Sequence, residues 1–193
     1  MSYAKLMEAL YSSAEEMLQS LTHLLDLEEI RIGRHTLQDT KGQKRGHVEI
    51  VQIWYCLFMP SFVNPILLVH IDYGELSREG KTSKSVQQQI VAEFSQQEKK
   101  CIRYEIRELA SREDKLFSIL STLPLQATDW SVSLDGISYV LGIHNTNVDL
   151  RLRFSNPKLT EWKELQVYLH SLLKNFQDGF FYEGLVKYMD NRD

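Results

Sequence analysis

The loop at residues 74–82 contains the residue types that hold phosphate groups in nucleotide-binding proteins. An apolar segment runs into this loop, and its two glycines are followed by Lys81 and Thr82. In a P-loop, backbone N–H groups and a lysine at the start of a helix hold the phosphates. Here five residues separate the glycines instead of four, and they include Glu75 and Glu79, whose carboxylates repel phosphate. A phosphate- or nucleotide-handling enzyme that uses Lys81 and Thr82 is therefore an alternative hypothesis, and an ordinary surface loop is the simpler one.

Histidine, cysteine and serine spacing gives little support for metal or hydrolytic chemistry. The six histidines are scattered, and the sequence has no HExxH motif, no paired Cys/His spacing and no GxSxG motif. His70 and Asp72 share one face of a predicted strand, but two ligands alone do not make a metal site. Cys56 and Cys101 lie in apolar segments without CxxC spacing, which predicts buried free thiols rather than a disulfide. We therefore predict no catalytic residue, no metal ion and no cofactor.

A polar patch on one face of a predicted sheet is the strongest candidate for binding. Arg151 and Arg153 alternate with apolar residues, and His144, Ser138 and Asp149 fall on the same predicted face. Arginine is favoured at recognition surfaces because its planar guanidinium binds a carboxylate in two places. His144, Arg151 and Arg153 are therefore candidate partner-binding residues, although an ordinary solvent-facing sheet would carry the same pattern.

Basic residues in two other segments suggest a second kind of binding. Lys41, Lys44 and Arg45 lie in a polar loop, and Lys84 is near the start of a predicted helix. The α-βββ-α order predicted for residues 3–98 is similar to that of a double-stranded RNA-binding domain, which reads RNA with a connected basic face. The net charge of −4 has the wrong sign for this function, because nucleic-acid binders are normally basic. RNA binding is an alternative, and nucleic acid is not the expected partner.

The clearest structural pattern in the sequence runs from residue 130 to residue 176. Asp135-Gly136 predicts a two-residue hairpin, because both central positions of a type I′ turn need a positive φ. A second hairpin centred on Asn145-Thr146 places all the apolar residues of three strands on a single face, and a one-residue shift would reverse the whole set. The predicted cross-strand pairs are Leu134–Ile137, Val132–Tyr139, Trp130–Leu141, Ile143–Val148, Leu141–Leu150, Tyr139–Leu152 and Ile137–Phe154.

Hydrophobic periodicity predicts the remaining elements. Helices are predicted over residues 3–26, 83–94, 111–122, 160–176 and 180–189, and strands over residues 30–37, 48–59, 66–73 and 101–108. Residues 53–59 are apolar on both faces, which predicts a central strand covered on both sides. Residues 101–108 also keep helical spacing, so a helix there is the alternative to a strand.

These elements give the order α-βββ-α-β-α-βββ-α and an α+β fold, in which helices pack on one face of antiparallel sheet built from two three-stranded meanders. The similar order of residues 1–98 and 99–193 hints at a duplicated unit, although no residue-level repeat supports one. A chain of 193 residues fits one large domain, and we predict a single α+β domain over residues 1–193.

Composition and terminal pattern favour a soluble binding protein. Hydrophobic residues make up 43% of the chain and charged residues 25%, as in an average globular domain. The N-terminus lacks the continuous apolar run of a signal peptide, and no apolar window is long enough to span a bilayer. We expect a cytoplasmic, non-enzymatic protein that binds another protein and no membrane. Small bacterial immunity and adaptor proteins offer an analogy at the level of the fold.

Overall fold

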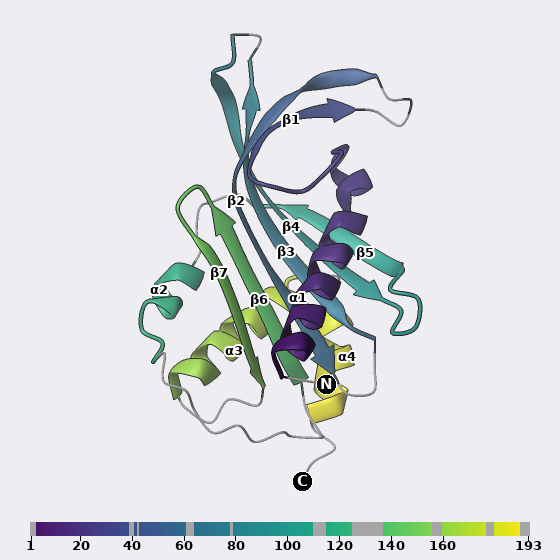
Figure 1. Cartoon of the computed structure of the whole chain (residues 1–193), viewed down its shortest axis with the longest axis vertical. Coiled ribbons are helices and arrows are strands. Elements are labelled where there is room, and N and C mark those ends of the chain that lie inside the picture. The colour runs from purple at the N-terminus through teal and green to yellow at the C-terminus, as the bar shows by residue number, and fades with distance from the viewer. Residues whose placement is uncertain are drawn as a thin grey trace.

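A seven-stranded antiparallel sheet with helices on both faces forms the centre of the chain (Figure 1). The structure is a computed structural model, and it describes residues 3–38, 41, 43–60, 64–77, 79–109, 115–124, 137–155, 160–176 and 180–189. The strands are β1 (Gly33–Gln38), β2 (Lys44–Pro60), β3 (Ile66–Leu76), β4 (Thr82–Phe94), β5 (Cys101–Glu108), β6 (Ile137–Asn145) and β7 (Asp149–Ser155). The helices are α1 (Tyr3–Ser20), the 3-10 helix η1 (Thr22–Leu25), α2 (Leu116–Leu120), α3 (Thr160–Leu173) and α4 (Phe180–Met189). The predicted α+β class with antiparallel sheet is confirmed, and none of the described helices is long and apolar enough to cross a membrane.

Strand β2 is the longest strand, and it joins the two parts of the sheet. One edge of β2 pairs with β3 from residue 47 to residue 58. The other edge is divided, because residues 44–50 pair with β1 and residues 52–60 pair with β6. The second half of β2 is buried on both faces, which confirms the central strand predicted from its apolar sequence.

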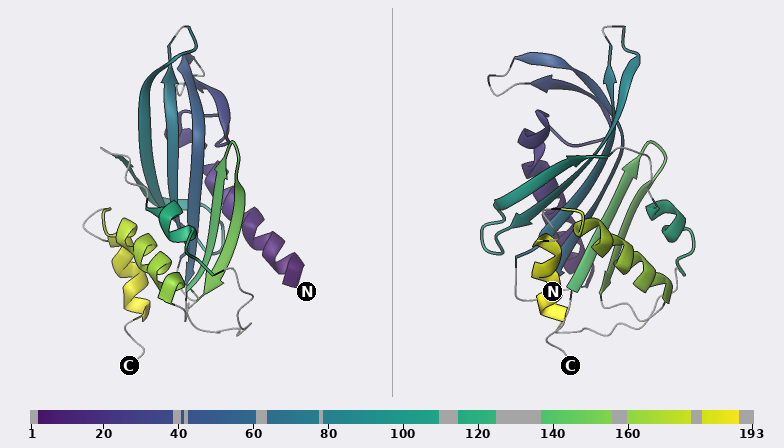
Figure 2. Two further views of the ribbon diagram at one scale, coloured as in Figure 1. Left: turned by 90° about the vertical axis from the view of Figure 1, so that its left-hand side faces the viewer. Right: turned by 180° about the vertical axis from the view of Figure 1, so that it is seen from behind.

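Different helices cover the two faces of the sheet, as Figure 2 shows. On one face, here called the α1 face, Met17 and Leu18 of α1 pack against apolar side chains of β2 and β3. On the opposite face, here called the α3 face, Leu165 and Leu169 of α3 pack into a second core together with α4. The sequence predicted helices on one face only. Helices are needed on both because β2 and β3 carry apolar side chains on both sides, and both sides must be removed from water.

The segment predicted as a helix over residues 83–94 is strand β4, which pairs with β3 along its whole length. Ile90 and Phe94 suggested a helical stripe, but residues four apart also share one face of a strand. In β4 both side chains lie on the α1 face, and Val91 lies on the α3 face. Pairing with β3 therefore overrides the helical spacing. The strand predicted at residues 101–108 is confirmed as β5.

The described strands lie in the order β5-β4-β3-β2-β6-β7, with β1 beside the first half of β2. The first five strands follow one another in the chain, and the β6–β7 hairpin then adds to β2. The predicted order α-βββ-α-β-α-βββ-α with two three-stranded meanders is thus replaced by α-βββββ-α-ββ-α-α in the described residues. Residues 1–98 and 99–193 therefore differ in their element order, because β6 completes a sheet that the first half begins.

Strands β6 and β7 form the second predicted hairpin in a different register. The prediction placed Ile143 opposite Val148, whereas the structure places it opposite Leu150. The side chain of Asn145 accepts hydrogen bonds from the backbone N–H groups of Asn147 (2.8 Å) and Val148 (2.9 Å), which moves the turn along the chain. The shift is two residues, so the apolar side chains keep their predicted face.

The remaining predictions concern the helices and the first hairpin. The hairpin predicted at Asp135-Gly136 and the strand before it lie outside the described residues, and β6 has β2 and β7 on its two edges. The helix predicted over residues 3–26 ends at Ser20, and η1 continues from Thr22. Helices α3 and α4 confirm the predictions at residues 160–176 and 180–189 to within their ends.

Candidate functional site

The open edge of strand β5 is the candidate binding site. β5 lies at the end of the sheet, and within the described residues β4 is the only strand that pairs with it. Just beyond β5, the N–H group of Leu109 donates to the carbonyl of Gln87 at 2.8 Å. Backbone groups alternate along an antiparallel strand, so Arg103, Glu105 and Arg107 direct their N–H and C=O groups toward β4. The even-numbered residues 104–108 direct theirs outward, and this outward row of backbone groups is called the β5 edge. A β-bulge at Ile102 interrupts the alternation near the start of the strand.

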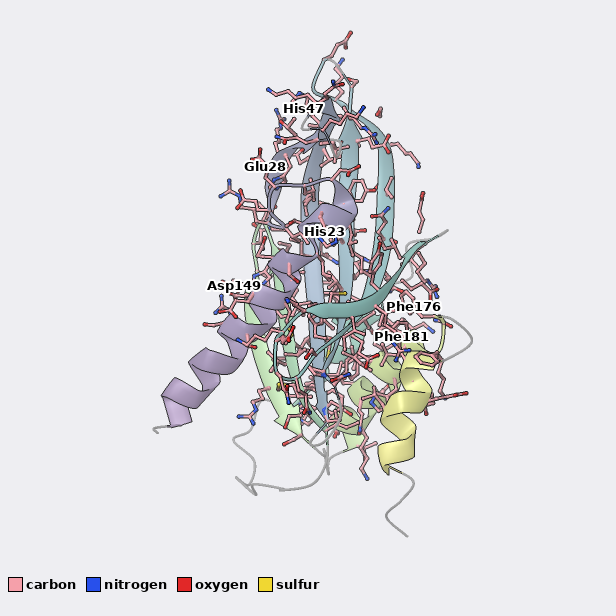
Figure 3. The ribbon with its side chains drawn as sticks, turned by 90° about the vertical axis from the view of Figure 1, so that its right-hand side faces the viewer. His23, Glu28, His47, Asp149, Phe176 and Phe181 are labelled. Carbon is pink, nitrogen blue, oxygen red and sulfur yellow. The ribbon has the colours of Figure 1, made fainter. Side chains whose placement is uncertain are left out.

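A shallow hollow lies beside the β5 edge. It has a volume of about 570 Å³ and is lined by Ser20, His23 and residues 99–104. Ile102 and Tyr104, which lie in this lining, are 55% and 48% exposed. Figure 3 shows β5 crossing the side of the molecule nearest the viewer, with His23 and Phe181 on opposite sides of it. The β5 edge therefore presents backbone hydrogen-bonding groups and apolar side chains together.

Contacts on both faces hold β5 in place. The Arg103 guanidinium forms an ion pair with Glu93 of β4 and lies 3.6 Å from the centroid of the Phe180 ring in α4. In the loop before β5, Lys99 Nζ lies 2.9 Å from a carboxylate oxygen of Glu16 in α1. The β5 edge is therefore carried by a strand that is anchored to both α1 and α4, as a precise recognition site requires.

A buried polar layer lies on the α3 face of strands β3, β4 and β5. The antiparallel register places His70, Asp72, Gln89 and Glu105 on this face. His70 Nε2 lies 3.6 Å from Asp72 Oδ1, and the His70 ring stacks on Trp54 with the ring centroids 5.2 Å apart. The structure therefore brings the predicted His70–Asp72 pair together.

This polar layer has unsatisfied atoms but no metal-binding arrangement. Both ring nitrogens of His70, Asp72 Oδ1, Gln89 Oε1 and Glu105 Oε2 are buried and have no hydrogen-bond partner among the described residues. The same part of the chain contains no group of three His, Cys, Asp or Glu side chains that could hold a metal ion. Buried polar atoms without partners carry a desolvation cost, so the layer is a place where a further hydrogen-bonding group would add stability.

The structure brings together three residues of the predicted patch, His144, Asp149 and Arg151. His144 Nδ1 lies 3.1 Å from Asp149 Oδ1, and Arg151 Nε lies 3.8 Å from the same oxygen. Arg151 Nη2 also pairs with Glu15 of α1 at 2.8 Å, and Figure 3 shows Asp149 beside α1. Arg153 follows on the same face of β7. The Arg151 guanidinium thus ties β7 to α1, and the carboxylate that it binds belongs to the chain itself.

Lys81 and Thr82 lie in a hairpin between β3 and β4. The N–H group of Ser77 donates to the Lys81 carbonyl at 2.8 Å, and Lys81 Nζ lies 3.7 Å from Glu79 Oε2. A P-loop needs a helix N-terminus to face the phosphates, but here the chain continues as β4 from Thr82. The predicted strand–loop–helix context is therefore wrong, because the segment after the loop pairs with β3.

Two of the basic residues considered for RNA binding, Arg45 and Lys84, are paired with carboxylates of the chain. Arg45 Nη1 lies 3.8 Å from Asp26 Oδ2, and Lys84 Nζ lies 3.3 Å from Glu108 Oε1. Because β4 is a strand, residues 3–98 do not have the α-βββ-α order of a double-stranded RNA-binding domain. The similarity in element order predicted from the sequence is therefore wrong.

A hydrogen-bonded network in the core of the α3 face has no signal in the sequence. Tyr139 Oη of β6 accepts a hydrogen bond from Gln166 Nε2 (2.8 Å) and lies 2.9 Å from His170 Nε2 in α3. Burial, and to a smaller extent the charge of Lys174, lowers the pKa of His170 from 6.5 to about 4. Neutral His170 can therefore accept a hydrogen bond at Nε2 from the Tyr139 hydroxyl. Burial also raises the pKa of Tyr139, and the network links β6 to α3.

Both cysteines are free thiols. Cys56 is fully buried in β2, and Cys101 is half-buried at the start of β5. Burial raises the pKa of both thiols, so neither is an activated nucleophile at neutral pH. The prediction of buried free thiols thus holds fully for Cys56 and in part for Cys101.

No family model matches the chain, and no curated protein and no solved structure matches it. Function must therefore be inferred from the geometry and chemistry of the site rather than from the fold.

Proposed function

We propose that this chain is a non-enzymatic protein that acts by binding another protein, and that the β5 edge is its binding site. The observation that carries the proposal is the outward row of backbone groups along β5, whose only strand partner within the described residues is β4. An extended segment of a partner can add to such an edge as a further strand. Backbone hydrogen bonds then supply affinity, and alternate side chains supply specificity.

The side chains around the β5 edge suit an extended protein segment. Ile102 and Tyr104 are about half exposed and alternate along the strand, as contacts to a paired strand must. The neighbouring hollow of about 570 Å³ has room for a side chain from the added strand. Proteins normally protect long edge strands from pairing, so an edge with exposed apolar residues favours association.

In two of the polar clusters that could perform chemistry, the side chains pair with other side chains of this protein. Arg151 pairs with Glu15, and Tyr139 lies within hydrogen-bonding distance of His170. These contacts support structural roles for the side chains, and they favour binding over catalysis. An accessory role of this type, such as that of a bacterial immunity or adaptor protein, requires a binding surface and no catalytic site. The free thiols suit a reducing compartment such as the cytoplasm.

Site-specific photo-crosslinking tests the proposal. A photoreactive amino acid replaces Tyr104 in one variant and Val167 in the control variant, because Val167 is 67% exposed on α3 and is not part of β5. Irradiation in cells that make the chain is expected to link the variant at Tyr104 to a protein and to leave the variant at Val167 unlinked. No product at position 104, or equal yields at both positions, would refute the β5 edge as the binding site.

A further inference from the structure

We propose that the strand added to the β5 edge is β5 of a second copy of this chain. This inference rests on the proposed function and specifies the partner of the same edge. The two strands run antiparallel about a twofold axis at Tyr104, so that Tyr104 lies opposite the partner's Tyr104 and Ile102 lies opposite the partner's Ile106. Such an isologous contact joins the two sheets into one and covers exposed apolar side chains of both copies.

The backbone of β5 fits this arrangement. The even-numbered residues from Tyr104 onward carry the outward N–H and C=O groups, and a twofold axis at Tyr104 places the outward groups of Tyr104 opposite those of the partner's Tyr104. Opposed residues that both face the partner exchange two N–H···O bonds, so Tyr104 and the partner's Tyr104 form two intermolecular hydrogen bonds at the axis. A shift by one residue would oppose outward groups to inward groups and lose these bonds.

The charges of β5 select this register from its neighbours. With Tyr104 on the axis, Arg103 lies opposite the partner's Glu105, and the twofold axis repeats this pair. An axis at Arg103 would oppose two arginines, and an axis at Glu105 would oppose two glutamates. Like charges directly opposite each other destabilise a strand pair. Attraction in one register and repulsion in the adjacent ones therefore specify both the partner and the alignment.

Unused hydrogen-bonding capacity at Arg103 and Glu105 supports the same pairing. Glu105 Oε2 has no hydrogen-bond partner among the described residues. Arg103 binds Glu93 through Nε and Nη2, which leaves Nη1 for a second acceptor. The partner's Glu105, opposite Arg103, supplies that acceptor, and the twofold axis repeats the contact.

Competing self-pairings are less favourable. An axis at Ile106 would oppose Glu105 to the partner's Arg107, but it would align only residues 104–108 of the strand and leave Ile102 uncovered. At the other end of the sheet, an axis at Leu152 of β7 would oppose Arg151 to the partner's Arg153. Of the axes compared, the one at Tyr104 of β5 therefore combines opposite charges across the axis with coverage of Ile102.

Sedimentation equilibrium of the purified chain tests whether the copies pair. The 22.6 kDa chain is expected to form a dimer between low micromolar and millimolar concentration. Tyr104→Lys places two ammonium groups at the axis and should raise the dimer dissociation constant at least about tenfold. Val167→Lys adds the same charge at an exposed site on α3 and should leave the constant unchanged. Circular dichroism confirms that both variants are folded.

Cysteine cross-linking tests the register. In a Cys101→Ser background, mild oxidation should form a disulfide between two copies of the Tyr104→Cys variant. The Ile102→Cys variant alone should form no such disulfide. Ile102→Cys should form a heterodimer when mixed with Ile106→Cys. A monomeric wild-type chain at millimolar concentration, a dimer unaffected by Tyr104→Lys, or self-linking of Ile102→Cys equal to that of Tyr104→Cys would each overturn the proposal. If the purified chain is monomeric but position 104 photo-crosslinks to a different protein, self-pairing is refuted and the proposed function stands.

Discussion

Lowering the pH should destabilise the chain through His170, whose imidazole is buried between α3 and β6. Burial lowers the pKa of His170 to about 4, whereas an unfolded histidine titrates near 6.5. Between these values the unfolded chain binds a proton that the folded chain does not, so the free energy of unfolding falls as the pH falls from 6.5 toward 4. The loss at His170 amounts to about 2 kcal/mol between pH 7 and pH 5 and reaches about 3 kcal/mol near pH 4. This stability is fully present only above about pH 6.5.

Urea unfolding followed by tryptophan fluorescence at pH 7 and pH 5 measures this loss. His170→Gln keeps an acceptor for Tyr139 but does not titrate, so its loss between the two pH values should be smaller than that of the wild type by about 2 kcal/mol. Other titrating groups contribute equally to both proteins and cancel in the difference. A proton NMR titration of His170 with an apparent pKa of 6 or above, or equal losses in the two proteins, would refute the assignment of the shift to burial.

Two further predictions follow from close contacts in the sheet. A Cβ atom at Gly142 would lie 2.6 Å from the hydroxyl oxygen of buried Tyr55, so Gly142→Ala should lower the free energy of unfolding by about 1–3 kcal/mol. A Cβ atom at Gly46 in β2 would have no atom within 4 Å, so Gly46→Ala should change the free energy of unfolding little by comparison. Equal effects of the two substitutions in urea unfolding would contradict the packing argument. Glu15→Ala and Arg151→Ala should each cost up to about 1 kcal/mol, because their ion pair is partly exposed. The double variant should cost less than the sum of the two, and strict additivity in a double-mutant cycle would show that the pair contributes nothing.

The parts of the fold that the sequence predicted best are those in which one pattern excludes the others. Strict alternation from Arg151 to Phe154 fixed the face of β7 even though the register was wrong by two residues. The register depended on the Asn145 side chain, whose hydrogen bonds to the turn are not visible in a hydrophobic pattern. In β4 the spacing of Ile90 and Phe94 fits both a helix and a strand, and only pairing with β3 decides between them.

The candidate site was harder to predict because it depends on the position of an element rather than on its residues. The alternation of Ile102, Tyr104 and Ile106 identified a strand, but it could not show that this strand lies at the end of the sheet. The predicted patch residue Arg151 was placed correctly on a polar face, yet its partner Glu15 is more than a hundred positions away in the sequence. Contacts at that separation are set by topology and leave no local spacing signal.

The divided edge of β2 has a consequence for biosynthesis. The first five strands leave the ribosome well before β6, so residues 52–60 of β2 have no neighbour on one side while the intervening chain is translated, for roughly 5–15 s. Trp54 and Phe58, which are fully buried in the finished protein, belong to this stretch. During that interval the nascent chain therefore exposes an apolar strand with one unpaired edge. Its need for protection against misassembly is greatest just before β6 emerges.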